Sequence, residues 1–463
     1  MKKNIDQADI IRKLLDCENK YNFFDIITDD IQIYPLIRMG IFYEILKNLN
    51  IYEPQPKSLK INKINSILIL IKKLFNNFKI SKIKNHKIAI IEHPRRIDGS
   101  TEDIYTSFLY DIFPNDTLTI KHPIYGKIIT DGKTKYDSYH YDNILIKKKL
   151  LKFIYFKNKY FHITNKISKI INKEIDKNHD YFKFIEGLII DKIISCKLAK
   201  IFLSKYNFEC LIVVNGYGFN HFVLAAKQLG IEVIELQHGN IYDTHLGYHY
   251  PNSKVGSIDS FPDYLLTFGK YWNNQAKFPI PKNCVKENGF YFFEQSSLSN
   301  KVSGHLKKNK ILVISQQNIG RKLSYFTMDL AKKLTNYQFI FKPHPKEILN
   351  EAEYLNELKD VKNITISRKA LYKLYPTVEF QIGVFSTAIY EGLGHSVKTI
   401  IYKINGWKVM SKLENYQGVK FAKDINHAID LLINDKFQEP ELNIFFNKDV
   451  LENHLEFFKL YMN

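Results

Sequence analysis

The sequence predicts an α/β protein with two doubly wound parallel-sheet domains that face a cleft, preceded by extra N-terminal helices. Two observations predict this class. Short apolar runs rich in β-branched residues lack polar alternation, as expected for parallel strands covered on both faces. These runs alternate with helical segments at regular spacing, which is typical of a doubly wound sheet. The chain has 463 residues, 45% hydrophobic and 25% charged, which is enough for two or three domains with buried cores.

The first domain is predicted from helical segments followed by a βαβ unit. Residues 8–50 have the pattern of two or three helices, and residues 143–207 are mostly helical. A helix at 219–229, closed by Gly230, lies between two of the predicted strands. The strands expected in this domain are 87–92, 210–215, 231–236 and 264–268.

The second domain is predicted from a more regular alternation, which begins after a polar, Ser-rich segment at 295–309. That composition is typical of a linker. The expected strands are 311–315, 338–342, 363–366, 379–384 and 397–402, and the expected helices are 320–335, 346–358, 369–375 and 387–394. We therefore expect an N-terminal domain over 1–300, a C-terminal domain over 301–420, and C-terminal helices over 421–463 that pack back across the domains.

The charge balance narrows the class of partner. Lys and Arg number 67 against 48 acidic residues, a formal net charge of +19. Only six of the 67 are Arg, the residue that base readout and bidentate phosphate contacts prefer, so nucleic acid is not an expected partner. A/T-rich coding produces such a Lys excess by itself. The alternative is attraction to an anionic membrane or substrate.

Two basic stretches are relevant to localisation. Residues 57–87 and 147–156 interleave Lys with bulky apolar residues, as does a helix lying on an anionic bilayer. Ordinary surface helices with a buried stripe show the same pattern. No apolar run approaches the ~20 residues of a spanning helix. The four cysteines form no CxxC pair, which fits a reducing compartment. We expect a cytoplasmic protein, peripheral at the inner face of the cytoplasmic membrane if the basic stretches bind there.

Candidate functional residues lie where predicted strands of the second domain end. Strand 338–342 ends at Lys342 and leads into Pro343-His344-Pro345, where two prolines hold the histidine rigidly. A pinned imidazole beside a lysine suits an anion or a leaving phosphate; a plain helix start with Pro is the structural alternative.

The next site-bearing strand, 379–384, leads into Ser386 and Thr387 at a helix N-terminus, where hydroxyls and unsatisfied N–H groups can hold phosphate. Glu391 follows one turn later and can accept hydrogen bonds from ribose hydroxyls. A capping Ser/Thr with a solvated Glu is the alternative. Gln316 and Gly320 follow strand 311–315 at the same sheet edge.

Two loops of the first domain complete the candidate set. Strand 231–236 ends in Gln237-His238-Gly239, and a histidine followed by glycine has little to bury it, so His238 is expected to point into the cleft. The loop after strand 87–92 carries Arg95 and Arg96, which suit an anionic substrate, and Asp98 and Glu102, each a candidate general base.

The Lys342-Pro343-His344-Pro345 run, with Ser386-Thr387 and Glu391, resembles the nucleotide-binding half of GT-B glycosyltransferases, which have two Rossmann-like domains. The resemblance is closest to bacterial CMP-sugar enzymes, the sialyltransferases and Kdo transferases of capsule and lipopolysaccharide synthesis. It implies that His344, Ser386 and Thr387 hold the CMP phosphate, that the domain over 301–420 binds the nucleotide sugar, and that the domain over 1–300 binds the acceptor.

In the first domain, Ile97-Asp98-Gly99 resembles the family's Asp-Gly motif, whose Asp deprotonates the acceptor; that family has an acidic residue where this chain has Ile97. Gln237-His238-Gly239 is similar to a loop of capsule-type transferases. The resemblance covers residues 310–402, and 87–103 and 210–270 more loosely.

These patterns predict an inverting glycosyltransferase that moves a sugar from a nucleotide donor, CMP-linked and sialic-acid- or Kdo-like, to a surface polysaccharide or lipooligosaccharide. The catalytic candidates are Asp98, His238 and His344. No cofactor is expected, and no metal, because the sequence has no convincing DxD motif. The alternatives are a CDP-glycerol or CDP-ribitol phosphotransferase of teichoic-acid type, a sugar-nucleotide epimerase, and a non-catalytic binding module.

Overall fold

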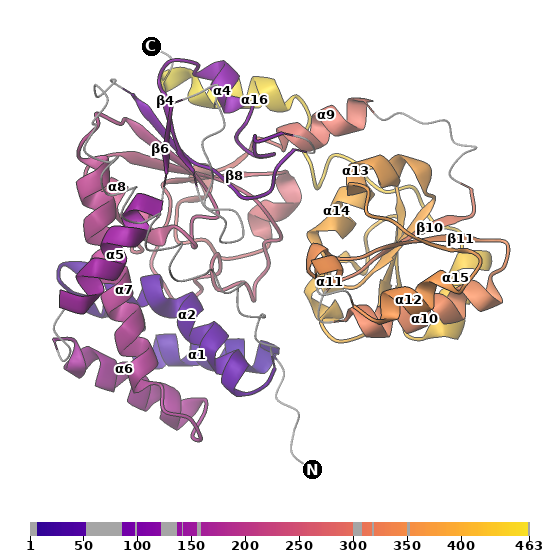
Figure 1. Cartoon of the computed structure of the whole chain (residues 1–463), viewed down its shortest axis with the longest axis horizontal. Helices are drawn as coiled ribbons and strands as arrows, with labels where there is room; N and C mark the ends of the chain where they lie inside the picture. Colours follow the sequence, from indigo (N-terminus) through magenta and orange to yellow (C-terminus); the bar gives the residue numbers. More distant parts are fainter. Residues whose placement is uncertain are drawn as a thin grey trace, which may run out of the picture. The chain divides into compact units, whose positions relative to one another are not determined.

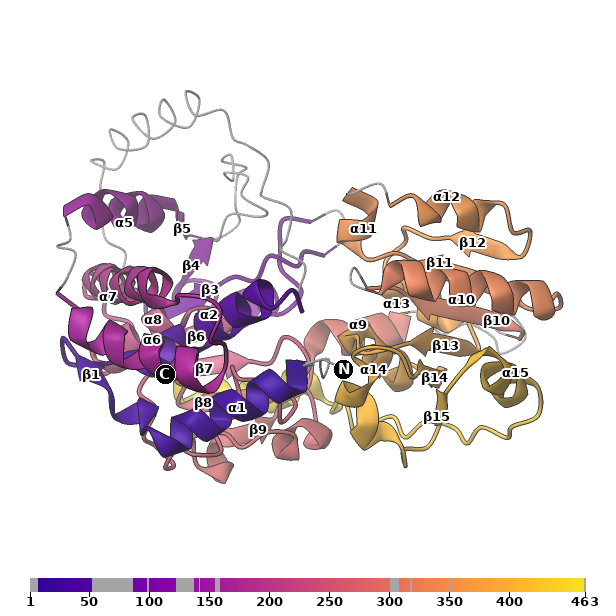
Figure 2. The ribbon, with the colours of Figure 1, turned by 90° about the horizontal axis from the view of Figure 1, so that it is seen from below.

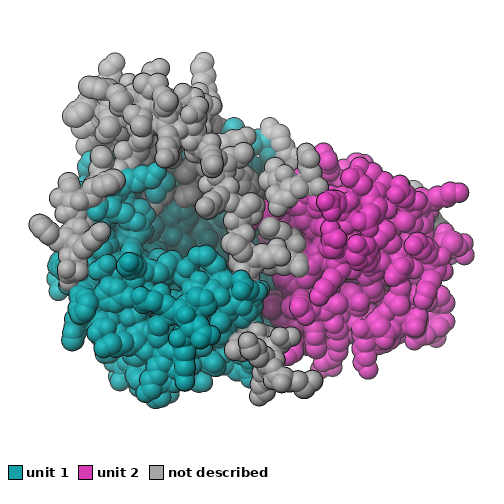
Figure 3. Space-filling model, turned by 60° about the horizontal axis from the view of Figure 1, so that its bottom comes forward, with its two compact units in different colours: residues 1–267, 273–286, 454–463 teal, residues 268–272, 287–453 magenta. Residues whose placement is uncertain are grey.

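The computed structural model describes residues 7–51, 86–97, 100–121, 137–140, 142–154, 159–299, 308–316, 319–349 and 352–461. The chain forms two compact units, coloured separately in Figure 3. Unit 1 comprises Met1–Thr267, Asn273–Lys286 and His454–Asn463, and unit 2 comprises Phe268–Trp272 and Glu287–Asn453. The chain therefore enters unit 2 and returns to unit 1 near its C-terminal end.

Unit 1 is built on a seven-stranded sheet with the order β5-β4-β3-β6-β7-β8-β9, which can be followed from top to bottom in Figure 2. Each strand pair with a described register is parallel. The adjacent strands β3 and β6 are apolar along their whole length, as expected for strands with both faces covered. The strands are β3 (Ile88–Ile91), β4 (Thr117–Lys121), β5 (Ser138–His140), β6 (Cys210–Val214), β7 (Glu232–Leu236), β8 (Tyr264–Thr267) and β9 (Val285–Glu287).

One face of this sheet forms a buried core with α5 (Asp142–Ile154), α7 (Phe182–Leu203) and α8 (Asn220–Lys227). Aromatic side chains of α16 (Val450–Phe458) pack on residues around α4 (Leu109–Ile112). The remaining helices of unit 1, α1 (Gln7–Lys20), α2 (Ile33–Asn48) and α6 (Phe161–Glu174), form a group with α7, as Figure 1 shows. The predicted N-terminal helices are therefore part of unit 1.

Unit 2 has a six-stranded sheet in the order β12-β11-β10-β13-β14-β15 (Figure 2). All its strand pairs are parallel, with Ile314 level with Lys342 and Val313 level with Ile382. Numbered within this sheet, the order is 3-2-1-4-5-6, the Rossmann order, and strands β3 to β8 of the seven-stranded sheet follow it too. The strands are β10 (Lys310–Ile314), β11 (Gln338–Lys342), β12 (Ile364–Ile366), β13 (Phe380–Gly383), β14 (Lys398–Tyr402) and β15 (Val419–Ala422).

Helices cover both faces of the second sheet. One face packs on α10 (Gly320–Lys333), α12 (Tyr354–Lys359) and α15 (Ile425–Ile433) in a single apolar core. The other carries α13 (Leu371–Leu374) and α14 (Thr387–Gly394), on the opposite side in Figure 1. The predicted fold class, two α/β units with doubly wound parallel sheets and additional N-terminal helices, is confirmed.

Three local expectations were wrong. Residues 295–299 are not linker but belong to α9 (Tyr291–Ser299), since Phe292 and Phe293 anchor that helix on Tyr372 and His395. The single helix expected at 346–358 is two helices, α11 (Pro345–Leu349) and α12. Strands β4, β5, β9 and β15 of the two large sheets were not predicted from the sequence.

The domain limits of 1–300, 301–420 and 421–463 stay a prediction; the compact units divide the chain at Lys286 and again at Asn453. Residues 52–85, which include most of the first basic stretch, lie outside the described part. Across the described ranges, no helix is both long and apolar enough to cross a bilayer.

Candidate functional site

The candidate site of unit 2 lies at the carboxyl ends of β10, β11 and β13. The strand order reverses between β10 and β13, and ligands of such sheets bind outside the carboxyl ends at this switch point. Gln316 follows β10, His344 follows β11 and Ser386 follows β13. β11 and β13 flank β10, so their ends are two strand spacings, or about 10 Å, apart. Three of the predicted loops therefore share one sheet edge.

The histidine turn after β11 is held by a buried glutamate. Glu347 is 2% exposed, and its Oε2 accepts the backbone N–H of His344 at 2.5 Å, while the Glu347 N–H donates to the His344 carbonyl at 2.9 Å. Glu347 is the third residue of α11, and its side chain bonds the N–H of the N-cap residue His344, which is the glutamate half of a capping box. The two prolines of the run and this box together fix the backbone of the turn.

The His344 ring has a defined proton position. Its Nδ1 accepts the backbone N–H of Lys346 at 3.2 Å, so the neutral ring carries its proton on Nε2. Burial, and then the Lys346 ammonium, lower the pKa of His344, which favours this neutral form. The ring is half-buried, and Nε2–H is the edge left to donate to a ligand.

Glu347 also explains Gly320. Oε1 of Glu347 accepts the hydroxyl of Ser315 at 2.8 Å and that of Tyr354. A Cβ at Gly320 would come within 1.8 Å of this oxygen and 2.1 Å of the Tyr354 hydroxyl. The glycine is required by this buried network, independently of its predicted role as a ligand contact. Glu347 and Tyr354 were not selected from the sequence.

The loop after β13 begins α14 as predicted. Ser386 is the N-cap, and its hydroxyl accepts the N–H of Ala388 at 3.3 Å. Gln316 accepts the N–H of Phe385 at 3.4 Å, which links the β10 and β13 loops. Thr387 opens the helix and is half-buried, whereas Glu391, expected at the surface of the site, is only 2% exposed.

Lys342, the last residue of β11, is turned toward the neighbouring loop, and its ammonium donates to the carbonyl of Arg368 at 3.3 Å. The ligand-binding roles assigned to these residues of unit 2 stay predictions.

In unit 1, the loop after β3 holds its charged residues in internal contacts. Arg96 Nη2 donates to Glu92 at 2.8 Å; within the described residues, Arg96 Nε and Nη1 have no hydrogen-bond partner. Arg95 Nη1 lies 3.5 Å from the Tyr105 hydroxyl. Glu102 is half-buried, and its N–H donates to the Ser100 hydroxyl. Asp98 lies outside the described residues.

His238 is far more enclosed than its glycine neighbour suggested. The rings of His93, Tyr217 and Tyr248 surround it, with centroids 5.6, 5.7 and 6.5 Å away. Burial, reinforced by nearby His93 and His245, holds the pKa of His238 well below its ordinary value.

The loop that presents His238 is held by its own contacts. The Tyr105 hydroxyl donates to the His238 carbonyl at 2.8 Å. The Gln237 side chain is buried and donates to the Gly239 carbonyl at 2.8 Å, so it braces the loop. The substrate contact assigned to Gln237 stays a prediction.

Behind His238 lies a buried carboxyl group. Glu235 is 1% exposed; its Oε1 accepts the Tyr248 hydroxyl at 2.7 Å and the Gly216 N–H at 2.9 Å. Burial raises the pKa of Glu235 to about 7. The Tyr248 hydroxyl is also 3.3 Å from His238 Nδ1.

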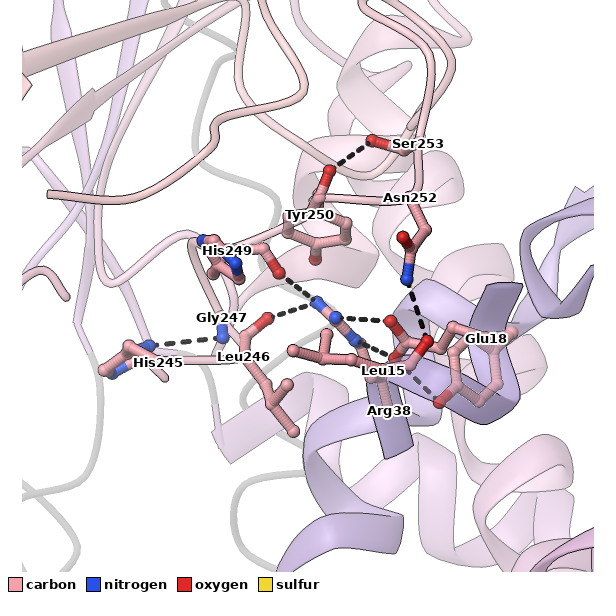
Figure 4. Close-up of polar contacts among 11 residues, drawn as sticks. Leu15, Glu18, Arg38, His245, Leu246, Gly247, His249, Tyr250, Asn252 and Ser253 are labelled. Atoms are coloured by element: carbon pink, nitrogen blue, oxygen red, sulfur yellow. Dashed lines mark hydrogen bonds and ion pairs between the residues drawn. The ribbon is translucent and has the colours of Figure 1, made fainter. Parts of the chain in front are cut away.

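The loop that carries Tyr248 is fixed to the N-terminal helices by Arg38 of α2, drawn in Figure 4. Arg38 donates to both carboxylate oxygens of Glu18 at 2.5 and 2.7 Å, and its Nη1 donates to the carbonyls of Leu246 and His249 at 2.6 and 2.9 Å. The guanidinium also lies 4.5 Å from the Tyr250 ring centroid. Both charged side chains are fully buried, so α1 and α2 help to build the site of unit 1.

The second basic stretch contains two kinds of lysine. Lys148 and Lys152 of α5 both pair with Asp191, whereas Lys147 and Lys149 are exposed. In the described ranges no group of three or more His, Cys, Asp or Glu side chains is arranged to hold a metal ion.

No protein-family model matches the chain. The uncharacterized protein MJ1060 of Methanocaldococcus jannaschii is 32% identical over 218 residues, 44% of this chain, and the chain spans only 38% of the length of that relative. Among solved structures, the UDP-GlcNAc 2-epimerase of the same organism aligns with a TM-score of 0.48 and 14% identity, over 81% of this chain and 99% of that one. The UDP-N-acetylglucosamine 2-epimerase of Rickettsia bellii aligns with a TM-score of 0.46 and 13% identity, over 82% of this chain and 95% of that one. The wall teichoic acid polymerase TagF aligns with a TM-score of 0.41 and 10% identity, over 87% of this chain and 93% of that one.

Proposed function

We propose that the chain is a glycosyltransferase that uses a nucleotide-linked sugar, with unit 2 binding the donor nucleotide and unit 1 activating the acceptor hydroxyl. The observation that supports this best is the His344 turn. Its Nε2–H donor stands at the same sheet edge as the N-terminus of α14, where Ser386 and Thr387 lie. Hydrogen-bond donors on both sides of the end of β10 suit the phosphate of a donor bound at this switch point of the sheet.

The proposed reaction is an inverting transfer without a metal. The acceptor oxygen bonds to the anomeric carbon of the donor sugar as the bond from that carbon to the phosphate oxygen breaks, and the nucleotide leaves with the electron pair. The acceptor proton moves to a base in unit 1. His344 Nε2–H and the α14 N-terminus stabilise the negative charge that grows on the leaving phosphate. Arg96, whose Nε and Nη1 have no hydrogen-bond partner among the described residues, suits an anionic group of the substrate.

We propose a CMP-linked sialic-acid- or Kdo-like donor and a surface-polysaccharide or lipooligosaccharide acceptor. His238 is the base candidate in the described part of unit 1, and Asp98 is the alternative. Activity of His238→Gln and Asp98→Asn separates them: the variant of the true base binds nucleotide normally and does not transfer sugar. If both variants transfer at the parent rate, neither residue is the base.

The donor site is tested by thermal shift with CMP, CDP, UDP and GDP. A nucleotide at 100 times its Kd stabilises by about 2.7 kcal/mol, which raises the Tm measurably. CMP is expected to stabilise; stabilisation by CDP alone would point to polyol-phosphate transfer, and no stabilisation by any nucleotide would overturn the donor site.

The same site is tested by His344→Ala, which should lower kcat by about 10²–10³-fold, as loss of one oxyanion donor does. His427→Ala is the matched control, because His427 lies in α15 of unit 2 and its Nδ1 also accepts a backbone N–H. Equal turnover of both variants would remove His344 from the mechanism. Conversion of the donor sugar without acceptor would indicate an epimerase, and nucleotide binding without turnover a binding module.

A further inference from the structure

Two polar side chains behind His238, those of Tyr248 and Glu235, form a hydrogen-bonded chain with it and have no role so far in the proposed reaction. The Tyr248 hydroxyl lies 2.7 Å from Glu235 Oε1 and 3.3 Å from His238 Nδ1. Glu235 and Tyr248 are each 1% exposed and so are shielded from water, whereas His238 is half-buried. On the other side of the ring, the Tyr217 hydroxyl lies 3.3 Å from His238 Nε2.

The hydrogen bonds between Glu235 and Tyr248 and between Tyr248 and His238 fix the position of each proton, because a hydroxyl group has only one proton to donate. Glu235 Oε1 already accepts the N–H of Gly216, so it is an acceptor, and the Tyr248 proton points to it. The Tyr248 oxygen is then left to accept a hydrogen bond from His238 Nδ1–H. A neutral imidazole carries one proton, so Nε2 has a lone pair.

The ionisation of Glu235 does not change this assignment. Its Oε2 lies against Gly216, where an added Cβ would come within 2.4 Å of it, and Oε1 has the two donors. A proton taken up by the carboxyl group therefore occupies Oε2 and leaves Oε1 as the acceptor. The bonding pattern toward Tyr248 is the same for both charge states.

The groups at the Nε2 edge agree with the same proton positions. Burial holds the pKa of Tyr217 above its ordinary value, so this hydroxyl keeps its proton and donates it to Nε2. The neutral state of His238 follows from its lowered pKa. Nε2 is therefore the atom that accepts a proton when an acceptor hydroxyl takes the place of Tyr217.

The position of Tyr248 is itself enforced by the backbone. It lies between Leu246 and His249, whose carbonyls both accept from Arg38 Nη1 (Figure 4). Two clamped carbonyls leave the segment little freedom to move the hydroxyl away from Glu235. The buried pair with Glu18 holds Arg38 in turn.

We propose that Glu235, acting through Tyr248, fixes His238 in the neutral tautomer that is protonated on Nδ1 and leaves Nε2 as the proton acceptor. Glu235 and Tyr248 are thus positioning residues. The use of Nε2 as a catalytic base rests on the function proposed above, whereas the tautomer itself does not.

The test is long-range ¹H–¹⁵N NMR of the full chain labelled with ¹⁵N-histidine at neutral pH, with the His238 signals assigned from His238→Gln. The expected spectrum shows a protonated Nδ1 and an unprotonated Nε2. Tyr217→Phe removes the donor at Nε2 and should leave this tautomer unchanged, because Tyr248 still fixes Nδ1. Adding Tyr248→Phe to Tyr217→Phe keeps the aromatic ring but removes the Tyr248 hydroxyl. In this double variant the proton of His238 should appear on Nε2.

Glu235→Gln is the conservative variant. Its amide oxygen can accept from both Gly216 and Tyr248, so the parent tautomer is expected. A parent spectrum in which Nε2 of His238 is protonated would overturn the proposal. A change of tautomer caused by Tyr217→Phe alone would overturn it too, as would an unchanged tautomer in the double variant Tyr217→Phe/Tyr248→Phe. If Tyr248→Phe does not fold, the parent and Tyr217→Phe spectra still decide.

Transfer assays give a separate readout. Tyr248→Phe should lower kcat about 10–100-fold without changing KM for the donor, because the donor does not contact this chain of residues. If the protein transfers no sugar but shows the expected tautomers, the proposed function is refuted and the proposal about the His238 tautomer still holds. An unchanged kcat in an active enzyme would instead remove Glu235 and Tyr248 from the mechanism.

Discussion

Replacing Arg38 with Leu should destabilise unit 1 strongly, because Glu18 then keeps a buried charge without its cation. Both side chains are fully buried, and without Arg38 the carboxylate retains the Tyr34 hydroxyl at 2.9 Å. Removing one partner of a buried ion pair typically costs about 3–5 kcal/mol. At ~2–4 °C for each kcal/mol in a domain of this size, the Tm of unit 1 should fall by roughly 6–20 °C.

The measurement is calorimetric unfolding of the full chain, with Arg12→Leu as the matched control. Arg12 pairs with Asp9 on α1, but its side chain is 70% exposed, so its loss should change stability by less than ~0.5 kcal/mol. The double variant Glu18→Leu/Arg38→Leu should be more stable than Arg38→Leu, because no charge is left buried alone. Equal Tm values for Arg38→Leu and Arg12→Leu would refute the reasoning.

Three further predictions concern single sites. Burial raises the pKa of Glu235 from 4.5 to about 7, so the folded chain binds this proton more tightly than the unfolded chain. The protonated group therefore stabilises the folded state at low pH by about 3 kcal/mol, and this stability is lost as pH rises from ~4.5 to ~7. In Glu235→Gln, the free energy of unfolding measured in urea should fall less between pH 5 and pH 8 than in the parent. An equal fall in both proteins would contradict this prediction. Gly320→Ala should lower both Tm and CMP affinity, because its Cβ would meet the Glu347 carboxylate at 1.8 Å; unchanged values would show that the turn adapts. Replacing Lys147 and Lys149 with Gln should weaken binding to anionic vesicles roughly 10–30-fold, at about 1 kcal/mol for each lysine. Replacing Lys148 and Lys152, which pair with Asp191, should weaken this binding less. Equal effects of the two double replacements would count against a membrane-binding face on α5.

The fold was predictable where strands are apolar throughout. The run 210–215 matches its strand within a residue, since both sheet faces exclude water; 231–236 matches as well, although it carries Glu232 and Glu235. β4 was missed because Thr117–Lys121 alternates polar and apolar residues and lacks that signature. The helix α9 was missed because its stabilising contacts come from Tyr372 and His395, far away in the sequence.

The candidate site was predictable only as far as position at strand ends reveals it. His238 and His344 stand out because each follows a strand, but their supporting residues do not. Glu235 lies inside a strand, and Arg38 inside a helix, where their partners depend on residues distant in the chain. The signal available for Glu235 was a carboxyl group in a strand covered on both faces, which requires a buried partner.

The return of the chain to unit 1 has a consequence for synthesis on the ribosome. Unit 1 receives no residue between Lys286 and His454, and the aromatic rings of α16 then pack on Phe108, Phe113 and Tyr264. At ~5–20 residues per second, translation of the intervening segment takes about ten to thirty seconds, enough time for unit 2 to fold. During that interval the nascent unit 1 exposes an apolar face to chaperones and proteases. The earliest-made unit is thus completed last, only after the whole of unit 2 has been synthesised.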